Sequence, residues 1–349
     1  MDRAERQMKW TQTMYRKWLD RWDERRAQRG DAVKEPTPFL LDAQLAFSNA
    51  DHATDISDFC ALADMAVADP KFFDEPSEAD LVYERKGGWI EFQSPVLTET
   101  DNNNTVRAQV TESRSNDHAL VIFHHWNASS RSRQIARFFS SQGFTIVQIA
   151  MPYHLERSRP GASHADDMLS PNLGRTVRSM RQAVLDGRKL IRILRSEGYE
   201  QVSVLGMSLG SWVAGLVAAH DETVKKAALF LTAGSLADMV WSGRATQHIR
   251  VSLEHEIDLP QLRRAWGPLN LENYADKLAR RDLDLQIVLA ERDTVVLPDI
   301  SHQLVAKLKD AGIQLRVLEL NCGHYSLSLP PQILWAGISV SRLLRQKSR

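Results

Sequence analysis

The chain has 349 residues, of which 43% are hydrophobic and 25% charged, and its 44 basic residues balance its 44 acidic residues. These proportions are typical of a soluble globular protein with a large core, and the neutral balance argues against nucleic acid as a partner. Two cysteines, Cys60 and Cys322, are too few and too far apart for a disulfide framework or a zinc site.

The first residues lack the apolar core of a secretory signal. No stretch is apolar over the roughly 18 residues that a membrane span requires. We therefore expect a cytoplasmic protein.

Residues 3 to 29 are dense in charged residues and predict an amphipathic helix that ends around Gly30. The apolar residues near one face of this helix are Met8, Tyr15, Trp18, Leu19 and Trp22. Basic residues combined with tryptophan can mark a helix that lies on a membrane surface. We favour instead a helix that docks this stripe on the protein body or on a second subunit, because Asp20, Asp23 and Glu24 weaken attraction to anionic lipid.

Residues 31 to 80 predict short helices broken by prolines, the clearest of them over residues 55 to 69. We therefore expect a helical extension over residues 1 to 80. From residue 81 the pattern changes to short strands, at 81–85, 89–93 and 105–113. Antiparallel strands of this kind often lie at the edge of an otherwise parallel sheet.

From residue 119 to the end of the chain, strands alternate with helices. The predicted buried strands are 119–123, 144–150, 202–205, 227–231, 285–290 and 315–320. Helices are predicted between them, including 134–141 and a long helix after Pro171. This alternation predicts an α/β domain over residues 81 to 349, with a mostly parallel sheet and helices on both of its faces.

More than fifty residues separate the strands that end at Leu231 and begin at Leu285, which exceeds the length of a simple crossover. We expect residues 234 to 283 to form a helical cap over the edge of the sheet. Its aromatic residues, Trp241, Trp266 and Tyr274, could line a substrate pocket or pack the cap against the body.

The segment Gly206-Met207-Ser208-Leu209-Gly210 lies between a predicted strand and a predicted helix. A strand that turns directly into a helix crowds the positions two before and two after the central residue, so glycine is needed at both. The turn exposes the Ser208 hydroxyl in front of a helix N-terminus, which favours negative charge nearby. Ser208 is therefore the candidate nucleophile.

A serine nucleophile needs a base, which is usually a neutral histidine held by an acid. His324 follows the last predicted strand, and Asp293 follows the strand before it. Both therefore belong at the same edge of the sheet as Ser208. Glu291 is the nearest competitor for the acid.

The motifs GMSLGS, ERDTVV and CGHYS, in this order, resemble the nucleophile elbow, acid loop and histidine loop of the α/β-hydrolase superfamily. The resemblance covers roughly residues 81 to 345. It implies the α/β-hydrolase fold and a catalytic triad of Ser208, Asp293 and His324, with no cofactor or metal.

The same resemblance implies an oxyanion hole formed by the backbone N–H groups of Leu209 and Trp126. His124 takes the histidine place of the superfamily's His-Gly-X turn, but His125 replaces its glycine, and Asn127 is an alternate donor. We expect structural roles for the histidine pair in preference to metal binding. Further along, Tyr153 and His154 lie in a loop that usually borders the active site, so they could contact substrate or support that loop.

The resulting hypothesis is a carboxylesterase that cleaves a small-molecule ester through an acyl-enzyme. Lipases, thioesterases and oligopeptidases share the triad, so the fold alone does not select among them. A lipid deacylase that reaches membranes through its N-terminal helix is the first alternative. A non-catalytic binding protein is the second, and the complete triad argues against it. Dehalogenases and epoxide hydrolases need a carboxylate where this chain has Ser208.

Overall fold

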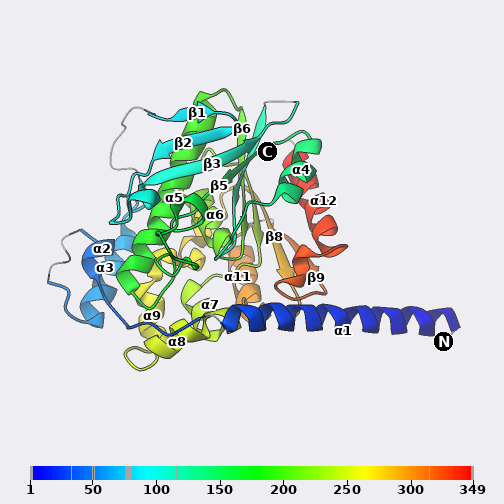
Figure 1. Ribbon diagram of the computed structural model, residues 1–349, viewed down its shortest axis with the longest axis horizontal. Helices are drawn as coiled ribbons and strands as arrows, with labels where there is room; N and C mark the ends of the chain where they lie inside the picture. The colour runs from blue at the N-terminus through cyan, green and yellow to red at the C-terminus, as the bar shows by residue number, and fades with distance from the viewer. Residues whose placement is uncertain are drawn as a thin grey trace.

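A nine-stranded sheet runs through the described part of the protein, which comprises residues 3–32, 34–48, 50, 52–74, 81–114, 117–313 and 315–346 of a computed structural model (Figure 1). The strands in chain order are β1 (Glu84–Lys86), β2 (Trp89–Gln93), β3 (Thr105–Thr111), β4 (His118–Phe123), β5 (Thr145–Ile149), β6 (Gln201–Met207), β7 (Lys226–Phe230), β8 (Asp284–Ala290) and β9 (Arg316–Leu320). Their order in space is β1-β2-β3-β5-β4-β6-β7-β8-β9.

The pairs β1–β2, β2–β3 and β3–β5 are antiparallel, and every pair from β5 to β9 is parallel. The predicted antiparallel edge and mostly parallel sheet are therefore confirmed. Every residue of β4, β5 and β7 is buried, as expected for parallel strands covered on both faces. β3 alternates between buried and partly exposed residues, in keeping with its place near the edge.

Helices cover both faces of the sheet, as the alternation of elements predicts (Figure 1). On one face, α5 (Leu173–Ser196), α6 (Leu209–His220) and α11 (Pro298–Asp310) contribute to the larger hydrophobic core. On the other face, α4 (Arg133–Ser141) and α12 (Gln332–Arg345) pack on the smaller one. Short 3-10 turns complete the chain: η1 (Asp101–Asn104), η2 (Leu155–Arg157), η3 (Arg244–Thr246), η4 (Gly267–Leu269), η5 (Leu271–Tyr274) and η6 (Ser326–Ser328).

The helices that the structure describes before β1 are α1 (Arg3–Asp31), α2 (Ala43–Ala46) and α3 (Ile56–Ala68). Phe59 of α3 is buried in the larger core, and Leu19 of α1 is buried in the smaller one. The extension therefore shares its cores with the sheet. The N-terminal half of α1 projects past the body (Figure 1). No described helix is both long enough and apolar enough to cross a bilayer.

The segment between β7 and β8 is helical in the structure. Its helices are α7 (Leu236–Ser242), α8 (Gln247–Leu253), α9 (Leu259–Ala265) and α10 (Ala275–Leu278). Trp266 is fully buried and Tyr274 nearly so, and both belong to the larger core. These two aromatic residues therefore pack the segment against the body, and Trp241, which is partly buried, packs against the same core.

Candidate active site

Ser208 lies at the junction of β6 and α6 in a backbone conformation that L-residues rarely adopt, with φ 53° and ψ −125°. Its N–H donates to the Phe230 carbonyl oxygen at 2.9 Å, which ties the turn to the neighbouring strand. A Cβ atom on Gly206 would come within 2.1 Å of the Gly210 carbonyl oxygen, and one on Gly210 within 2.4 Å of the carbonyl oxygens of Phe123 and His124 at the end of β4. The steric requirement for both glycines is thus confirmed.

The structure brings the three predicted triad residues together. His324 Nε2 lies 3.1 Å from Ser208 Oγ, and His324 Nδ1 lies 2.7 Å from Asp293 Oδ2. An ionised carboxylate only accepts hydrogen bonds, so the Nδ1 of a neutral His324 carries the proton. Nε2 is then free to accept the proton of the Ser208 hydroxyl, which is the arrangement that general-base activation needs.

Asp293 is held in place by its own loop. The side chain is 3% exposed, and its Oδ1 accepts the N–H groups of Val295 at 2.7 Å and Val296 at 2.9 Å. These two hydrogen bonds fix the orientation of the carboxylate, so its Oδ2 stays directed at His324 Nδ1. Glu291, the competing acid, is exposed, and the carboxylate that contacts His324 Nδ1 is that of Asp293.

The two predicted oxyanion donors follow β4 and β6. Within the described residues, the backbone N–H groups of Trp126 and Leu209 have no hydrogen-bond acceptor. The N–H of Asn127, the alternate donor, instead donates to His154 Nε2 at 2.9 Å. The Trp126 indole N–H donates to the Ala165 carbonyl oxygen at 3.0 Å, and its ring stacks on the His248 ring with centroids 6.0 Å apart. These two contacts hold the loop after β4 in place.

His124 lies in the loop after β4 and His154 in the loop after β5, and each ring accepts a backbone N–H from the other loop. His124 Nε2 accepts the N–H of Met151 at 3.1 Å, while His154 Nε2 accepts the N–H of Asn127. Each Nδ1 donates to a backbone carbonyl, that of His125 or Pro152, at 2.8 Å. Burial lowers the pKa of His154 to about 3 and that of His124 well below its usual value. Both rings are therefore neutral, and neither has a nitrogen left for a metal.

Tyr153 and His154 are each 2% exposed, which argues against the predicted substrate contacts. The Tyr153 backbone has φ 61°, and its N–H donates to Asn103 Oδ1 at 3.0 Å. Of the two readings that the sequence allowed, the structure favours support of the loop. Burial of these side chains cannot be deduced from the dipeptide alone, because both have a polar end that often faces a binding site.

Sequence analysis missed Asp23, which lies on α1 and contacts the histidine loop. Its Oδ1 accepts the N–H groups of Tyr325 at 2.7 Å and Ser326 at 3.0 Å, and its Oδ2 accepts the Ser326 hydroxyl. Burial raises the pKa of the neighbouring Tyr325 to about 12, so its phenol stays protonated. About 300 residues separate the two partners in sequence, and no local pattern could have paired them.

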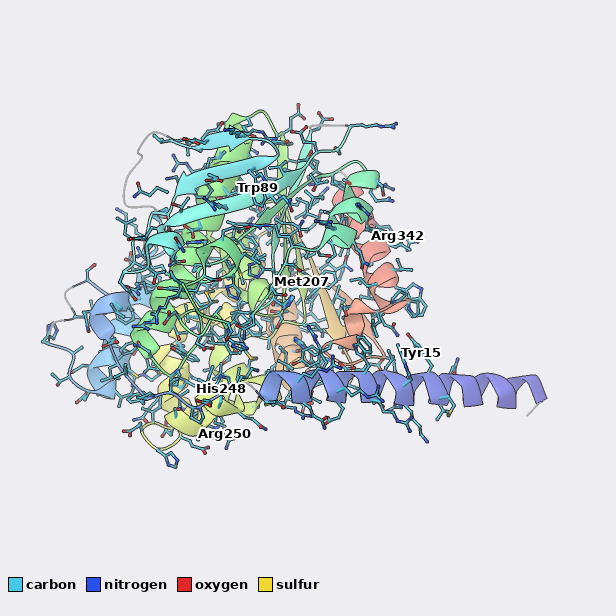
Figure 2. The ribbon with its side chains drawn as sticks, viewed as in Figure 1. Tyr15, Trp89, Met207, His248, Arg250 and Arg342 are labelled. Atoms are coloured by element: carbon cyan, nitrogen blue, oxygen red, sulfur yellow. The ribbon has the colours of Figure 1, made fainter. Side chains whose placement is uncertain are left out.

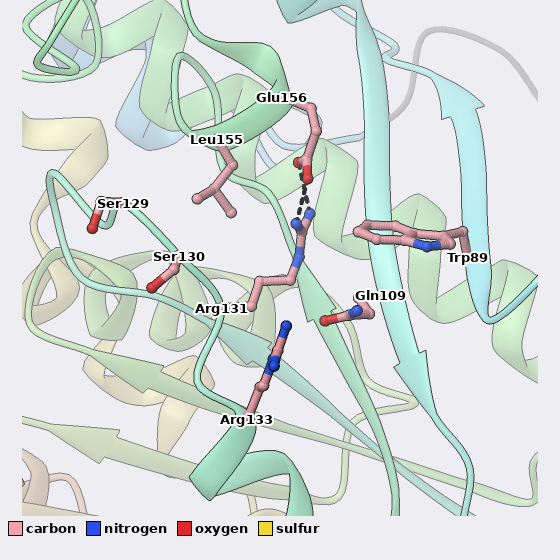
Figure 3. A pocket seen from close by; sticks show the side chains of 8 residues that line it. All are labelled: Trp89, Gln109, Ser129, Ser130, Arg131, Arg133, Leu155 and Glu156. Atoms are coloured by element: carbon pink, nitrogen blue, oxygen red, sulfur yellow. Dashed lines mark hydrogen bonds and ion pairs between the residues drawn. The ribbon is translucent and has the colours of Figure 1, made fainter.

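A cleft of about 500 Å³ has none of the three triad residues in its lining (Figure 3). Its lining residues are Trp89, Gln109, Ser129, Ser130, Arg131, Arg133, Leu155 and Glu156. Arg131 is engaged there by a bidentate pair with Glu156 and by the Trp89 ring, 4.7 Å away. A smaller cavity of about 40 Å³ is lined by His125 and Met207 and lies nearer to Ser208.

No protein-family model and no curated protein matches this chain. Among solved structures, the chain is similar to an esterase of Pyrococcus furiosus, at 14% identity and a TM-score of 0.53, over 77% of this chain and 94% of that one. It is also similar to a lipase in an open form, at 13% identity and a TM-score of 0.52, over 73% and 96%. An acylaminoacyl peptidase of Pyrococcus horikoshii matches at 13% identity and a TM-score of 0.57, over 76% of this chain but only 42% of that one.

The predicted fold is confirmed by these likenesses together with the sheet order and its antiparallel edge. The chain has the α/β-hydrolase fold. At this level of identity the likeness concerns the fold alone, so the chemistry has to be argued from the side chains at the β6–α6 turn.

Proposed function

We propose that this protein is a serine hydrolase that cleaves a carboxylic ester through Ser208, His324 and Asp293. The observation that carries the proposal is the continuous set of contacts from Ser208 Oγ through His324 to a buried carboxylate. Ser208 itself lies on a strained turn at the carboxyl end of the central strand β6. Ligands of open α/β sheets bind at this end of the strands.

In the first half of the reaction, Ser208 Oγ attacks the ester carbonyl carbon while His324 Nε2 takes the hydroxyl proton. Asp293 stabilises the imidazolium that forms and keeps the ring oriented. The negative charge on the carbonyl oxygen is met by the backbone N–H groups of Leu209 and Trp126. Collapse of this intermediate breaks the ester C–O bond, and His324 returns the proton to the leaving alcohol.

In the second half, a water molecule gives its proton to His324 and attacks the acyl-enzyme carbonyl carbon. The C–O bond to Ser208 breaks, the acid leaves, and Ser208 Oγ regains the proton. The small-molecule ester is the proposed substrate, and no metal or cofactor takes part in these steps.

An amide or a lipid ester could follow the same steps, and the fold likeness includes a peptidase and a lipase. The chain spans less than half of the peptidase, so a peptidase activity would have to operate without the remainder of that protein. We therefore rank the ester first and include the other two classes in the test.

The test measures hydrolysis of p-nitrophenyl esters of increasing acyl length, beside an acyl-aminoacyl p-nitroanilide and an emulsified triacylglycerol. We expect turnover of at least one ester by the wild type and loss of more than about a thousandfold in Ser208→Ala. Ser141→Ala, at an exposed position on α4, is the matched control and should retain full activity.

A covalent probe separates the chemistry from the choice of substrate. A fluorophosphonate should add once to the wild type, and peptide mapping should place the adduct on Ser208. Folded protein that neither hydrolyses any of these substrates nor reacts with the probe would instead indicate a hydrolase-like binding protein.

A further inference from the structure

The outer face of α1 carries aromatic side chains that the protein body does not cover. Met14, Trp18 and Trp22 are 47%, 48% and 40% exposed. Trp18 stacks on Tyr15 at 5.9 Å and contacts Trp22 at 6.0 Å, so the rings form one continuous stripe. The helix docks on the body through Leu19 and Ala27, which lie on a different side of the helix.

The acidic residues of α1 whose side chains the structure describes are engaged within the protein. Asp20 pairs with Arg292 at 2.7 Å, Glu24 pairs with Arg244 at 2.5 Å, and Asp23 binds the histidine loop. Asp31 also pairs with Arg244, at 3.0 Å. Asp20, Asp23 and Glu24 are the carboxylates that, in the sequence, argue against attraction to lipid. In the structure each of them is bound to a group of the protein body, which offsets part of its charge, while Asp20 and Glu24 stay about half exposed.

The basic residues of α1 have the opposite arrangement. The exposed ones among the described side chains are Arg16, Lys17, Arg21, Arg25, Arg26 and Arg29. Helical spacing puts Arg21, Arg25 and Arg29 on the side that carries Trp18 and Trp22. In the part of the chain that the structure describes, no carboxylate lies within ion-pair distance of any of them. Over residues 12–31, whose side chains the structure describes, α1 has six basic and four acidic residues, and all six basic side chains are exposed.

A second apolar surface adjoins this face. The Tyr15 hydroxyl donates to the Pro330 carbonyl oxygen at 2.8 Å, just before α12 begins. α12 stands above the projecting half of α1 (Figures 1 and 2) and exposes Trp335 by 55% and Leu334 by 48%. Arg342 lies two turns further along the same helix, so this second surface also combines apolar and basic side chains.

We propose that the outer face of α1, with the adjoining start of α12, docks the protein on an anionic lipid surface. Tryptophan rings prefer the boundary between headgroups and acyl chains, and unpaired arginines bind anionic headgroups. A second copy of the chain fits this face less well. A two-fold contact would bring Arg21 and Arg25 toward their own copies, and the α1 carboxylates that the structure describes are already engaged with the body.

Docking in this way would bring the active site close to the lipid. Asp23 joins the same helix to the loop of His324, and Glu24 joins it to the helical segment after β7. The loop that carries His324 therefore lies against the body-facing side of the docked helix. That such a surface supplies the substrate ester rests on the proposed function, whereas the docking itself does not.

The test is co-sedimentation of the full chain with vesicles of phosphatidylcholine alone or mixed with phosphatidylglycerol. We expect binding to the mixed vesicles that weakens as salt is raised. Arg21→Gln with Arg25→Gln should weaken this binding by about fivefold for each residue. Trp18→Ala with Trp22→Ala should weaken it by tenfold or more. Ser208→Ala should bind as the wild type does, so the result does not depend on catalysis.

Two matched variants control for charge and for apolar exposure. Arg133→Gln with Arg137→Gln removes the same charge from α4, and Met65→Gln removes an exposed apolar residue from α3. Both should bind as the wild type does. Equal binding by the α1 variants and the wild type would overturn the proposal. The proposal would also be overturned if sedimentation velocity showed that the wild type is a dimer and that Trp18→Ala with Trp22→Ala converts it to monomers.

Discussion

At the scale of single residues, the candidate site depends on which atoms of His324 are occupied. The carboxylate of Asp293 can only accept, and its second oxygen is already held by two backbone N–H groups. The ring is therefore fixed in the tautomer that leaves Nε2 facing Ser208. Orientation and protonation state are set by one interaction, so one substitution can change both.

Replacing Asp293 with asparagine should remove most of the activity without removing the fold. The amide can donate to His324 Nδ1, which moves the ring proton to Nε2 and leaves Ser208 without a base. We expect kcat to fall by about 10⁴-fold, measured on the best ester of the series. Glu291→Gln is the control and should stay near the wild-type rate. A similar loss in both variants, or activity of Asp293→Asn within tenfold of wild type, would contradict the assignment.

At the scale of elements, the histidine loop is supported from outside the sheet. The Asp23 carboxylate accepts two backbone N–H groups immediately after His324, and this carboxylate belongs to a helix at the other end of the chain. The loop thus depends on α1 for its position, and an amphipathic surface helix contributes to the geometry at Ser208.

Asp23→Ala should therefore lower kcat while leaving KM nearly unchanged. Small displacements of a catalytic base are costly, and we expect a loss on the order of tenfold to a hundredfold. Asp23→Asn should recover most of the rate, because its Oδ1 can still accept both backbone N–H groups. These rates are measured alongside the thermal midpoint of each variant.

Glu24→Ala provides the comparison from the same helix. It breaks a surface pair with Arg244, and such pairs contribute only about 0–1 kcal/mol to stability. Its kcat should match that of the wild type. If both alanine variants lose activity in proportion to stability, Asp23 has a structural role only.

The sequence predicts the elements well because their patterns are local. Every predicted strand of the sheet is present, and the long helix after Pro171 begins at Leu173. The glycine spacing around Ser208 is likewise a requirement of one turn. The functions of Asp23, His124 and His154 depend on contacts between distant segments. A polar side chain of these types carries no local sign of whether it faces solvent, substrate or backbone.

At the scale of the whole molecule, several histidines are buried in a neutral state. Burial lowers the pKa of His118 to about 4, and those of His154 and His220 to about 3. His118 Nε2 lies 2.7 Å from Ser203 Oγ, and its ring packs edge-on against Phe144. Histidines of the unfolded chain have a pKa of about 6.5. Below that pH the folded protein therefore binds fewer protons than the unfolded chain.

This difference predicts loss of stability in mild acid. Above pH 6.5 these histidines are neutral in both states and contribute no pH dependence. As the pH falls from about 6.5 toward 4, the unfolded chain takes up protons that the folded state refuses. Each such histidine then lowers the free energy of unfolding by about 1.4 kcal/mol per pH unit. Urea unfolding at pH 7.5, 6.0 and 5.0 should show a progressive fall of the midpoint.

His118→Gln isolates one of these contributions, at a site far from Ser208 along β4. The glutamine keeps a polar contact for Ser203 but does not titrate, so this variant should lose less stability than the wild type between pH 6.5 and 5.0. The difference in slope should approach the contribution of one histidine. Parallel curves would show that His118 is protonated equally in both states, and the acid sensitivity would then have to come from the other histidines with lowered pKa values, such as His154 and His220.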